Sequence, residues 1–203
     1  MRPDRGEVAR YLGYGERPLE GAVARQVEEC LAQLERACTP RQVYRRMGRS
    51  QLPFSSVELD RHLAGCEEVF LFAATLGAPA DTLLRRWAAQ DMARAVVGQA
   101  CAATLLECFC DTCCEALAAR LQPGLFLRPR YSPGYGDLPL SCQRPLLELL
   151  DGGRRLGLSL TQGDMLVPAK SVTAVIGITQ EEQSCQIHKC AACPNVNCPF
   201  RKV

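Results

Sequence analysis

Ala93-Arg-Ala-Val-Val-Gly-Gln-Ala-Cys-Ala-Ala-Thr-Leu-Leu106 is the stretch of this 203-residue chain that decides its fold. Apolar residues occupy nearly every face of a helix with this sequence, so the helix must be covered on most of its sides. We therefore expect a long central helix within residues 81–121. A chain of this length supports one well-buried core, and a second full domain would be cramped.

Helical patterns come before this stretch and strand patterns come mostly after it. Pro18 to Ala37 carries apolar residues at helical spacing, and short helices are expected at Glu7–Leu12 and after Ser55 and Ser56. The continuous apolar run Val69–Leu76 predicts a buried strand. Later segments are expected as strands, with one short helix among them: strands 125–128, 156–161 and 171–178, and helix 145–150.

This order of elements predicts an α+β fold with a single domain over residues 1–180, built from a central long helix and a mostly antiparallel twisted sheet. Residues 181–203 form a separate cysteine-rich tail. The chain has 24 basic and 22 acidic residues, so its charge gives no reason to expect nucleic-acid binding. No run of 18 apolar residues and no signal peptide occur, which favours a cytoplasmic protein without a membrane span.

Between the long helix and the later strands lies a segment rich in proline, glycine, arginine and tyrosine. Residues 128–139 read Arg-Pro-Arg-Tyr-Ser-Pro-Gly-Tyr-Gly-Asp-Leu-Pro, with three prolines and two glycines among twelve residues. The prolines exclude a continuous helix or a central strand, so a fixed loop is expected. Arginine charge and flat aromatic faces suit a ligand that carries a carboxylate and a nucleobase. A solvated turn with incidental arginines is the alternative interpretation.

Two motifs, in the same order and at similar spacing, make the chain resemble the S-adenosylmethionine-binding activation domain of cobalamin-dependent methionine synthase. They are Arg130-x-x-Pro-Gly-Tyr135 and Met165-x-x-Pro-x-x-Ser-Val172. The resemblance covers roughly residues 65–180, and the first sixty residues are closer to free-standing relatives of that domain.

The resemblance implies that six residues surround S-adenosylmethionine: Arg130, Ser132, Gly134, Tyr135, Glu107 and Tyr14. Arg130 would pair with the methionine carboxylate, and Tyr135 would contact the adenosine or the sulfonium. Glu107 on the long helix would bind the ammonium group, or would instead lie at an exposed edge. Backbone groups around Ser132 and Gly134 would meet the adenine edge.

The resemblance also implies a function. The leading hypothesis is a separate subunit that supports reductive methylation of a cobalamin methyltransferase and so reactivates it. Its partner would be a corrinoid protein or a methionine synthase that lacks its own activation domain, with an electron donor. Cobalamin would be present only through that partner. The segment 136–141 departs from the methionine synthase pattern, and the cysteine tail has no counterpart there.

The chain holds 13 cysteines, in two groups. Nine lie between Cys30 and Cys142 in apolar or helical patterns and are expected to be reduced, buried side chains. The last four predict an iron–sulfur cluster or a zinc site: Cys185, Cys190, Cys193 and Cys198. Two alternative functions depend on this tail, an accessory iron–sulfur electron-transfer protein and a zinc-stapled adaptor for a corrinoid protein.

Two motif-like segments are not interpreted as sites. Asp60-Arg-His-Leu-Ala-Gly65 matches the Asp-x-His-x-x-Gly signature by which cobalamin-binding domains supply a cobalt ligand, but it lies in a helical pattern. His62 is therefore expected on a helix surface. Gly13-Tyr-Gly follows no predicted strand and is not a dinucleotide-binding loop. Asp91 is expected to be a carboxylate on a helix surface.

Overall fold

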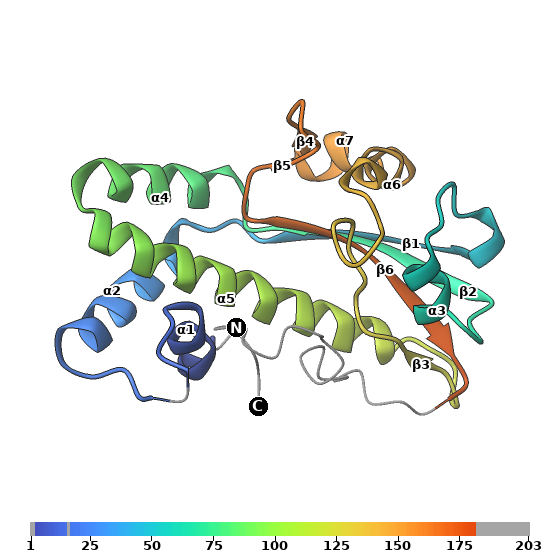
Figure 1. Ribbon diagram of the computed structural model, residues 1–203, viewed down its shortest axis with the longest axis horizontal. Coiled ribbons are helices and arrows are strands. Elements are labelled where there is room, and N and C mark those ends of the chain that lie inside the picture. Colours follow the sequence, from blue (N-terminus) through green and yellow to red (C-terminus); the bar gives the residue numbers. More distant parts are fainter. Residues whose placement is uncertain (1–2, 16, 182–203) are drawn as a thin grey trace.

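The computed structural model describes residues 3–15 and 17–181, and these residues form an α+β fold (Figure 1). A four-stranded antiparallel sheet runs in the order β1-β2-β6-β3. Its strands are β1 (Arg41–Gly48), β2 (Glu68–Thr75), β6 (Ser171–Thr179) and β3 (Phe126–Leu127). The fold class expected from the sequence is confirmed.

Helices cover both faces of the sheet, so the central strand β2 is buried on both sides. Its alternate residues belong to two different cores. Phe70, Phe72 and Ala74 pack with the long helix α5 (Met92–Ala118). Val69, Leu71 and Ala73 pack under α6 (Gln143–Leu150), α7 (Gly152–Leu156) and α3 (Val57–His62). This double burial explains why the strand reads as a continuous apolar run.

The helix α5 crosses one face of the sheet and is covered by three other helices (Figure 1). They are α1 (Arg5–Tyr11), α2 (Gly21–Ala37) and α4 (Ala78–Gln90). Among the residues that the structure describes, α5 alone is long and apolar enough to cross a membrane by length and composition. Its burial against these helices and the sheet accounts for that composition.

The remaining elements are short. They are η1 (Arg49–Gln51), η2 (Leu140–Cys142) and the hairpin β4 (Ser159–Leu160) with β5 (Leu166–Val167).

Several features differ from the sequence expectations. The expected strand 156–161 is reduced to Ser159–Leu160, because Leu156 is the last residue of α7. The expected helical element 81–121 is broken at Asp91, whose extended backbone ends α4 and whose side chain accepts a hydrogen bond from the Arg94 N–H at 3.2 Å. Asp91 is thus the N-cap of α5. Strand β1 was not expected, because its exposed arginines hide the alternation at Val43 and Met47. Helix α7 follows directly after α6 through Asp151, which adopts a left-handed conformation.

All nine cysteines in the described ranges are free thiols that are buried or half-buried, as the sequence interpretation holds. Burial raises the pKa of Cys101 to about 12 and that of Cys113 to about 11.

These raised pKa values predict slow thiol chemistry in the folded protein. At pH 8 the fraction of Cys101 present as thiolate is on the order of 10⁻⁴. Alkylation of Cys101 and Cys113 by iodoacetamide should therefore be at least about 100-fold slower than in urea-unfolded protein, and should accelerate as pH rises toward 11. Peptide mapping by mass spectrometry measures this. Equal rates in the folded and unfolded states would contradict the buried placement.

Gly98 tests how closely α4 and α5 approach each other. A Cβ atom at this position would lie 2.5 Å from Cε3 of Trp87 and 3.3 Å from Cδ2 of Leu84. Gly98→Ala should lower the free energy of unfolding by about 1–2 kcal/mol, because overpacking against the rigid indole outweighs the better helix propensity of alanine. Urea denaturation measures the change. Val96→Ala, at a position 55% exposed on the same helix, is the control and should change stability by less than ~0.5 kcal/mol.

Candidate functional site

The proline–glycine loop, residues 128–139, is attached to the edge of β6 through a change of register. Leu127 pairs with Ile178. Tyr131 forms a β-bridge with Val175. From Leu127 to Tyr131 the chain advances by four residues, while β6 advances by only three, from Ile178 to Val175. The extra residue is a β-bulge, which reverses the side of the sheet toward which the following side chains point. Arg130 consequently reaches α5, while Tyr131 packs against the core beneath α6.

Beyond the bulge the loop closes on itself through its backbone, as its prolines and glycines predict. The Tyr135 N–H donates to the Ser132 carbonyl at 3.0 Å, and the Gly134 N–H donates to the Leu138 carbonyl at 2.7 Å. Gly134 has a φ of +91°, a conformation that side chains other than glycine rarely adopt. These constraints fix the backbone on which Arg130 and Tyr135 are carried.

The guanidinium of Arg130 binds two carboxylates on one face of α5. It lies 2.7 Å from Oε2 of Glu107 and 2.8 Å from Oδ1 of Asp111. It also donates to Sγ of Cys114 at 3.4 Å. The three partners are spaced four and three residues apart, so they form one stripe along the helix. The Arg130 side chain is only 16% exposed, whereas those of Glu107 and Asp111 are 49% and 64% exposed.

The electrostatics of this cluster keep Arg130 charged. Burial alone would lower the pKa of the guanidinium, but the neighbouring Cys110, Cys114 and Glu107 raise it above its ordinary value. Burial raises the pKa of the Cys114 thiol, which Arg130 partly opposes. One guanidinium and two carboxylates leave the cluster with an excess of one negative charge.

Two tyrosines share the environment of Glu107. Partial burial raises the pKa of Tyr135, whose surface remains 41% exposed, and the negative charge of Glu107 raises it further while Arg130 lowers it. Burial and Glu107 likewise raise the pKa of Tyr11, the last residue of α1. The Arg10 guanidinium lies 4.5 Å from the centroid of the Tyr11 ring. Helix α1 packs on α5, and the charge of Glu107 acts on a tyrosine of α1 and on one of the loop.

Of the six predicted site residues, Glu107 and Arg130 form an ion pair. The charges of both act on the pKa of a third, Tyr135. Ser132 and Gly134 belong to the turn that lies between Arg130 and Tyr135 in the chain. The remaining predicted site residue, Tyr14, lies in the segment that follows α1. The centroid of its ring is 5.5 Å from the Arg17 guanidinium.

Sequence reasoning missed Asp111, Cys114 and Tyr11. For Asp111 a signal was present, because an acid four residues after Glu107 lies on the same helix face. Cys114 was grouped with packing cysteines. Nothing in the sequence distinguished Tyr11 from Tyr14.

The second motif lies at the opposite end of β6 and anchors the start of α4. Asp81 accepts hydrogen bonds from the backbone N–H groups of Ala169 at 2.6 Å and Lys170 at 3.3 Å. The Ser171 hydroxyl bonds to the Pro168 carbonyl at 2.7 Å. A depression of about 280 Å³ lies here, and burial lowers the pKa of Lys170 on its wall. These contacts connect the segment before β6 to the first turn of α4, which gives the motif a structural role.

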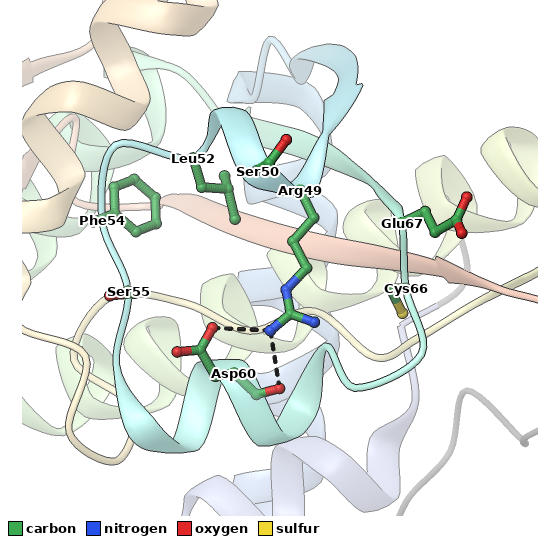
Figure 2. Close-up of a pocket in the computed structure, with 8 residues that line it drawn as sticks. All are labelled: Arg49, Ser50, Leu52, Phe54, Ser55, Asp60, Cys66 and Glu67. Atoms are coloured by element: carbon green, nitrogen blue, oxygen red, sulfur yellow. Dashed lines mark hydrogen bonds and ion pairs between the residues drawn. The ribbon is translucent and has the colours of Figure 1, made fainter.

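A larger depression, of about 530 Å³, lies beside α3 (Figure 2). Its lining combines apolar, charged and hydroxyl side chains: Arg49, Ser50, Leu52, Phe54, Ser55, Asp60, Cys66 and Glu67. The Arg49 side chain crosses it to reach Asp60, as Figure 2 shows. It shares no lining residue with the Arg130 cluster.

The four tail cysteines, Cys185, Cys190, Cys193 and Cys198, lie outside the described residues, and the metal site predicted there stays a prediction. Within residues 3–15 and 17–181, no group of three or more histidine, cysteine or acidic side chains is placed to hold a metal ion.

No protein-family profile matches the chain, and no curated protein sequence matches it. Among solved structures, the crystal structure of the MetH reactivation domain bound to AdoHcy is similar to it, with a TM-score of 0.61. The similarity covers 88% of this chain and 75% of that chain at 15% sequence identity. At such identity the likeness establishes the fold. The fold expected from the resemblance to the methionine synthase activation domain is therefore confirmed.

Proposed function

We propose that this chain binds S-adenosylmethionine at Arg130, Glu107 and Tyr135 and presents it to a partner protein that carries cobalamin. The observation that carries the proposal is the largely buried guanidinium of Arg130, which is held between two carboxylates of α5. The charge of Glu107 also raises the pKa of Tyr135 and of Tyr11. It occurs on the fold of the MetH reactivation domain, whose crystal structure holds AdoHcy.

The residues of the cluster match the two ends of the ligand. A guanidinium binds a carboxylate through two parallel hydrogen bonds, so Arg130 fits the methionine carboxylate. Glu107 and Asp111, which now bind Arg130, fit the methionine ammonium group. On binding, the ion pairs between Arg130 and the two carboxylates would be replaced by ion pairs of these groups with the carboxylate and the ammonium group of the ligand. Tyr135 and Tyr11 offer aromatic faces for the adenosine or the sulfonium.

The proposed role is one of positioning. A separate donor would supply one electron that reduces the partner's cobalamin from cob(II) to cob(I). Bound S-adenosylmethionine would then give its methyl group to the cob(I), and S-adenosylhomocysteine would leave. The protein's own residues bind and orient the ligand, and no side chain needs to transfer a proton. Exposed apolar side chains beside the loop support contact with a partner: Val57, Tyr135 and Leu140. Val57 adjoins the loop through Asp137, and Leu140 lies against Gly134.

Arg130→Ala should raise the Kd for S-adenosylmethionine about 30- to 100-fold, because a hydrogen-bonded charge contact of about 2–3 kcal/mol is lost. Arg130→Lys should recover only part of the affinity, since an ammonium group cannot bind a carboxylate as a planar fork. Isothermal titration calorimetry measures both. Arg144→Ala is the matched control, because Arg144 forms an exposed ion pair with Asp164. Absence of binding to the wild-type protein would refute the proposal.

The excess negative charge predicts a preference for the sulfonium form of the ligand. S-adenosylmethionine carries a net positive charge and S-adenosylhomocysteine is neutral overall, so the cluster should attract the former more strongly. Asp111→Asn should weaken the binding of both ligands, because both carry the ammonium group that Asp111 fits. It should weaken S-adenosylmethionine binding about 3- to 10-fold more than S-adenosylhomocysteine binding, because only the former carries the sulfonium charge.

Added salt should also reduce the preference for S-adenosylmethionine over S-adenosylhomocysteine, because salt screens the attraction between the cluster and the sulfonium. Glu148→Gln, on α6 across the sheet, removes the same charge at an exposed position and serves as the control. Equal losses for the two ligands in Asp111→Asn would contradict the electrostatic origin.

A further inference from the structure

Helix α3 lies against the proline–glycine loop and contacts it at several points. The Asp137 carboxylate accepts hydrogen bonds from the backbone N–H groups of Val57 at 2.8 Å and Glu58 at 3.1 Å, at the first turn of α3. These bonds, with one from Ser56, hold the pKa of Asp137 below its ordinary value. A charged carboxylate of the loop therefore serves as a cap for this helix.

The other end of α3 holds the start of the loop. Nε2 of His62 donates a hydrogen bond to the Pro129 carbonyl at 2.8 Å. Its ring lies 5.0 Å from the ring of Tyr131, which in turn lies 5.9 Å from the ring of Tyr135. The histidine of the Asp-x-His-x-x-Gly segment thus contacts the peptide carbonyl immediately before Arg130.

The middle of the loop is pressed against the same helix. The Tyr131 hydroxyl lies 3.4 Å from the Glu58 carboxylate and 3.3 Å from the Tyr135 carbonyl. A Cβ atom on Gly136 would collide with Glu58 and come within 2.7 Å of the Tyr131 hydroxyl. The Glu58 carboxylate ends a flexible side chain that can move aside, but Gly136 also has a φ of +52°, so this close approach favours glycine.

On its other side α3 is held to the sheet through Arg49. Arg49 donates to the Leu63 carbonyl at 3.0 Å and to Oδ1 of Asp60 at 3.0 Å, across the depression beside α3 (Figure 2). Asp60 lies about half a turn around the helix from Glu58 and His62. One side of α3 is therefore tied to the end of β1, and the opposite side carries the loop.

We propose that α3 is a clamp for the proline–glycine loop, and that Asp137 and His62 are positioning residues that set Arg130 and Tyr135 for ligand binding. The inference rests on the proposed function for its ligand. The clamp itself consists of contacts within the chain. Without it, the loop would sample other conformations, and the apparent affinity would fall in proportion to the fraction of competent loop.

The test combines loop mobility with ligand affinity. In Asp137→Ala without ligand, hydrogen–deuterium exchange at the amides of Gly134, Tyr135 and Leu138 should become about 5- to 10-fold faster. The Kd for S-adenosylmethionine should rise about 3- to 10-fold. Asp91→Ala is the matched control: it removes the cap at the far end of α5 and should leave the loop amides unchanged.

His62 provides a second, independent pair of variants. His62→Phe keeps a ring beside Tyr131 but loses the donor to Pro129, and should behave like Asp137→Ala. His62→Gln keeps a donor and should restore most of the protection. Unchanged loop exchange and unchanged Kd in both Asp137→Ala and His62→Phe would overturn the clamp. Faster loop exchange in these variants, with no S-adenosylmethionine binding by the wild type, would support the clamp and refute the proposed function.

Discussion

The hydrogen-bonding requirement of β6 is the constraint on which the rest of the structure depends. One edge of this buried strand pairs with β2 along eight residues, Ser171 to Ile178. Its other edge must also be paired, and the chain from Phe126 to Tyr131 supplies the partner groups. Because Pro129 lacks an N–H, this segment is suited to an edge position. The candidate site is therefore attached to an interior strand of the sheet.

The bulge within that edge decides where the arginine goes. With regular register, Tyr131 would share the side of Leu127, and Arg130 would point to the α6 side of the sheet. The extra residue exchanges these two directions. Tyr131 therefore packs against the core beneath α6, and Arg130 contacts the acidic side chains of α5. A single inserted residue thus sets which charged groups meet.

Sequence patterns predicted those features that repeat along an element. The apolar run of β2 and the all-round apolar α5 were recognisable because burial on both faces or on most sides leaves no polar stripe. The break at Asp91 was hidden, since aspartate is common both on helix surfaces and as an N-cap. Strand β1 was hidden because an edge strand tolerates exposed arginines, here Arg41, Arg45 and Arg46.

The site shows the same division between local and long-range information. Arg130, Tyr135 and Glu107 could be named from motif resemblance. That Asp111 joins Glu107 on Arg130 depends on the bulge, and that α3 holds the loop depends on contacts between residues about 80 positions apart, such as Val57 and Asp137. No periodicity encodes such contacts.

The internal ion pair also limits how the site can work. The Arg130 guanidinium forms ion pairs with two carboxylates of the chain itself. It is therefore not an unpaired charge that would bind any anion. An anion alone would have to displace Glu107 and Asp111 and leave both without a partner. A ligand that carries a carboxylate and an ammonium group on one carbon satisfies all three groups at once. Under the proposed function, this pairing would favour a ligand with an α-amino acid group, such as S-adenosylmethionine, over a simple anion.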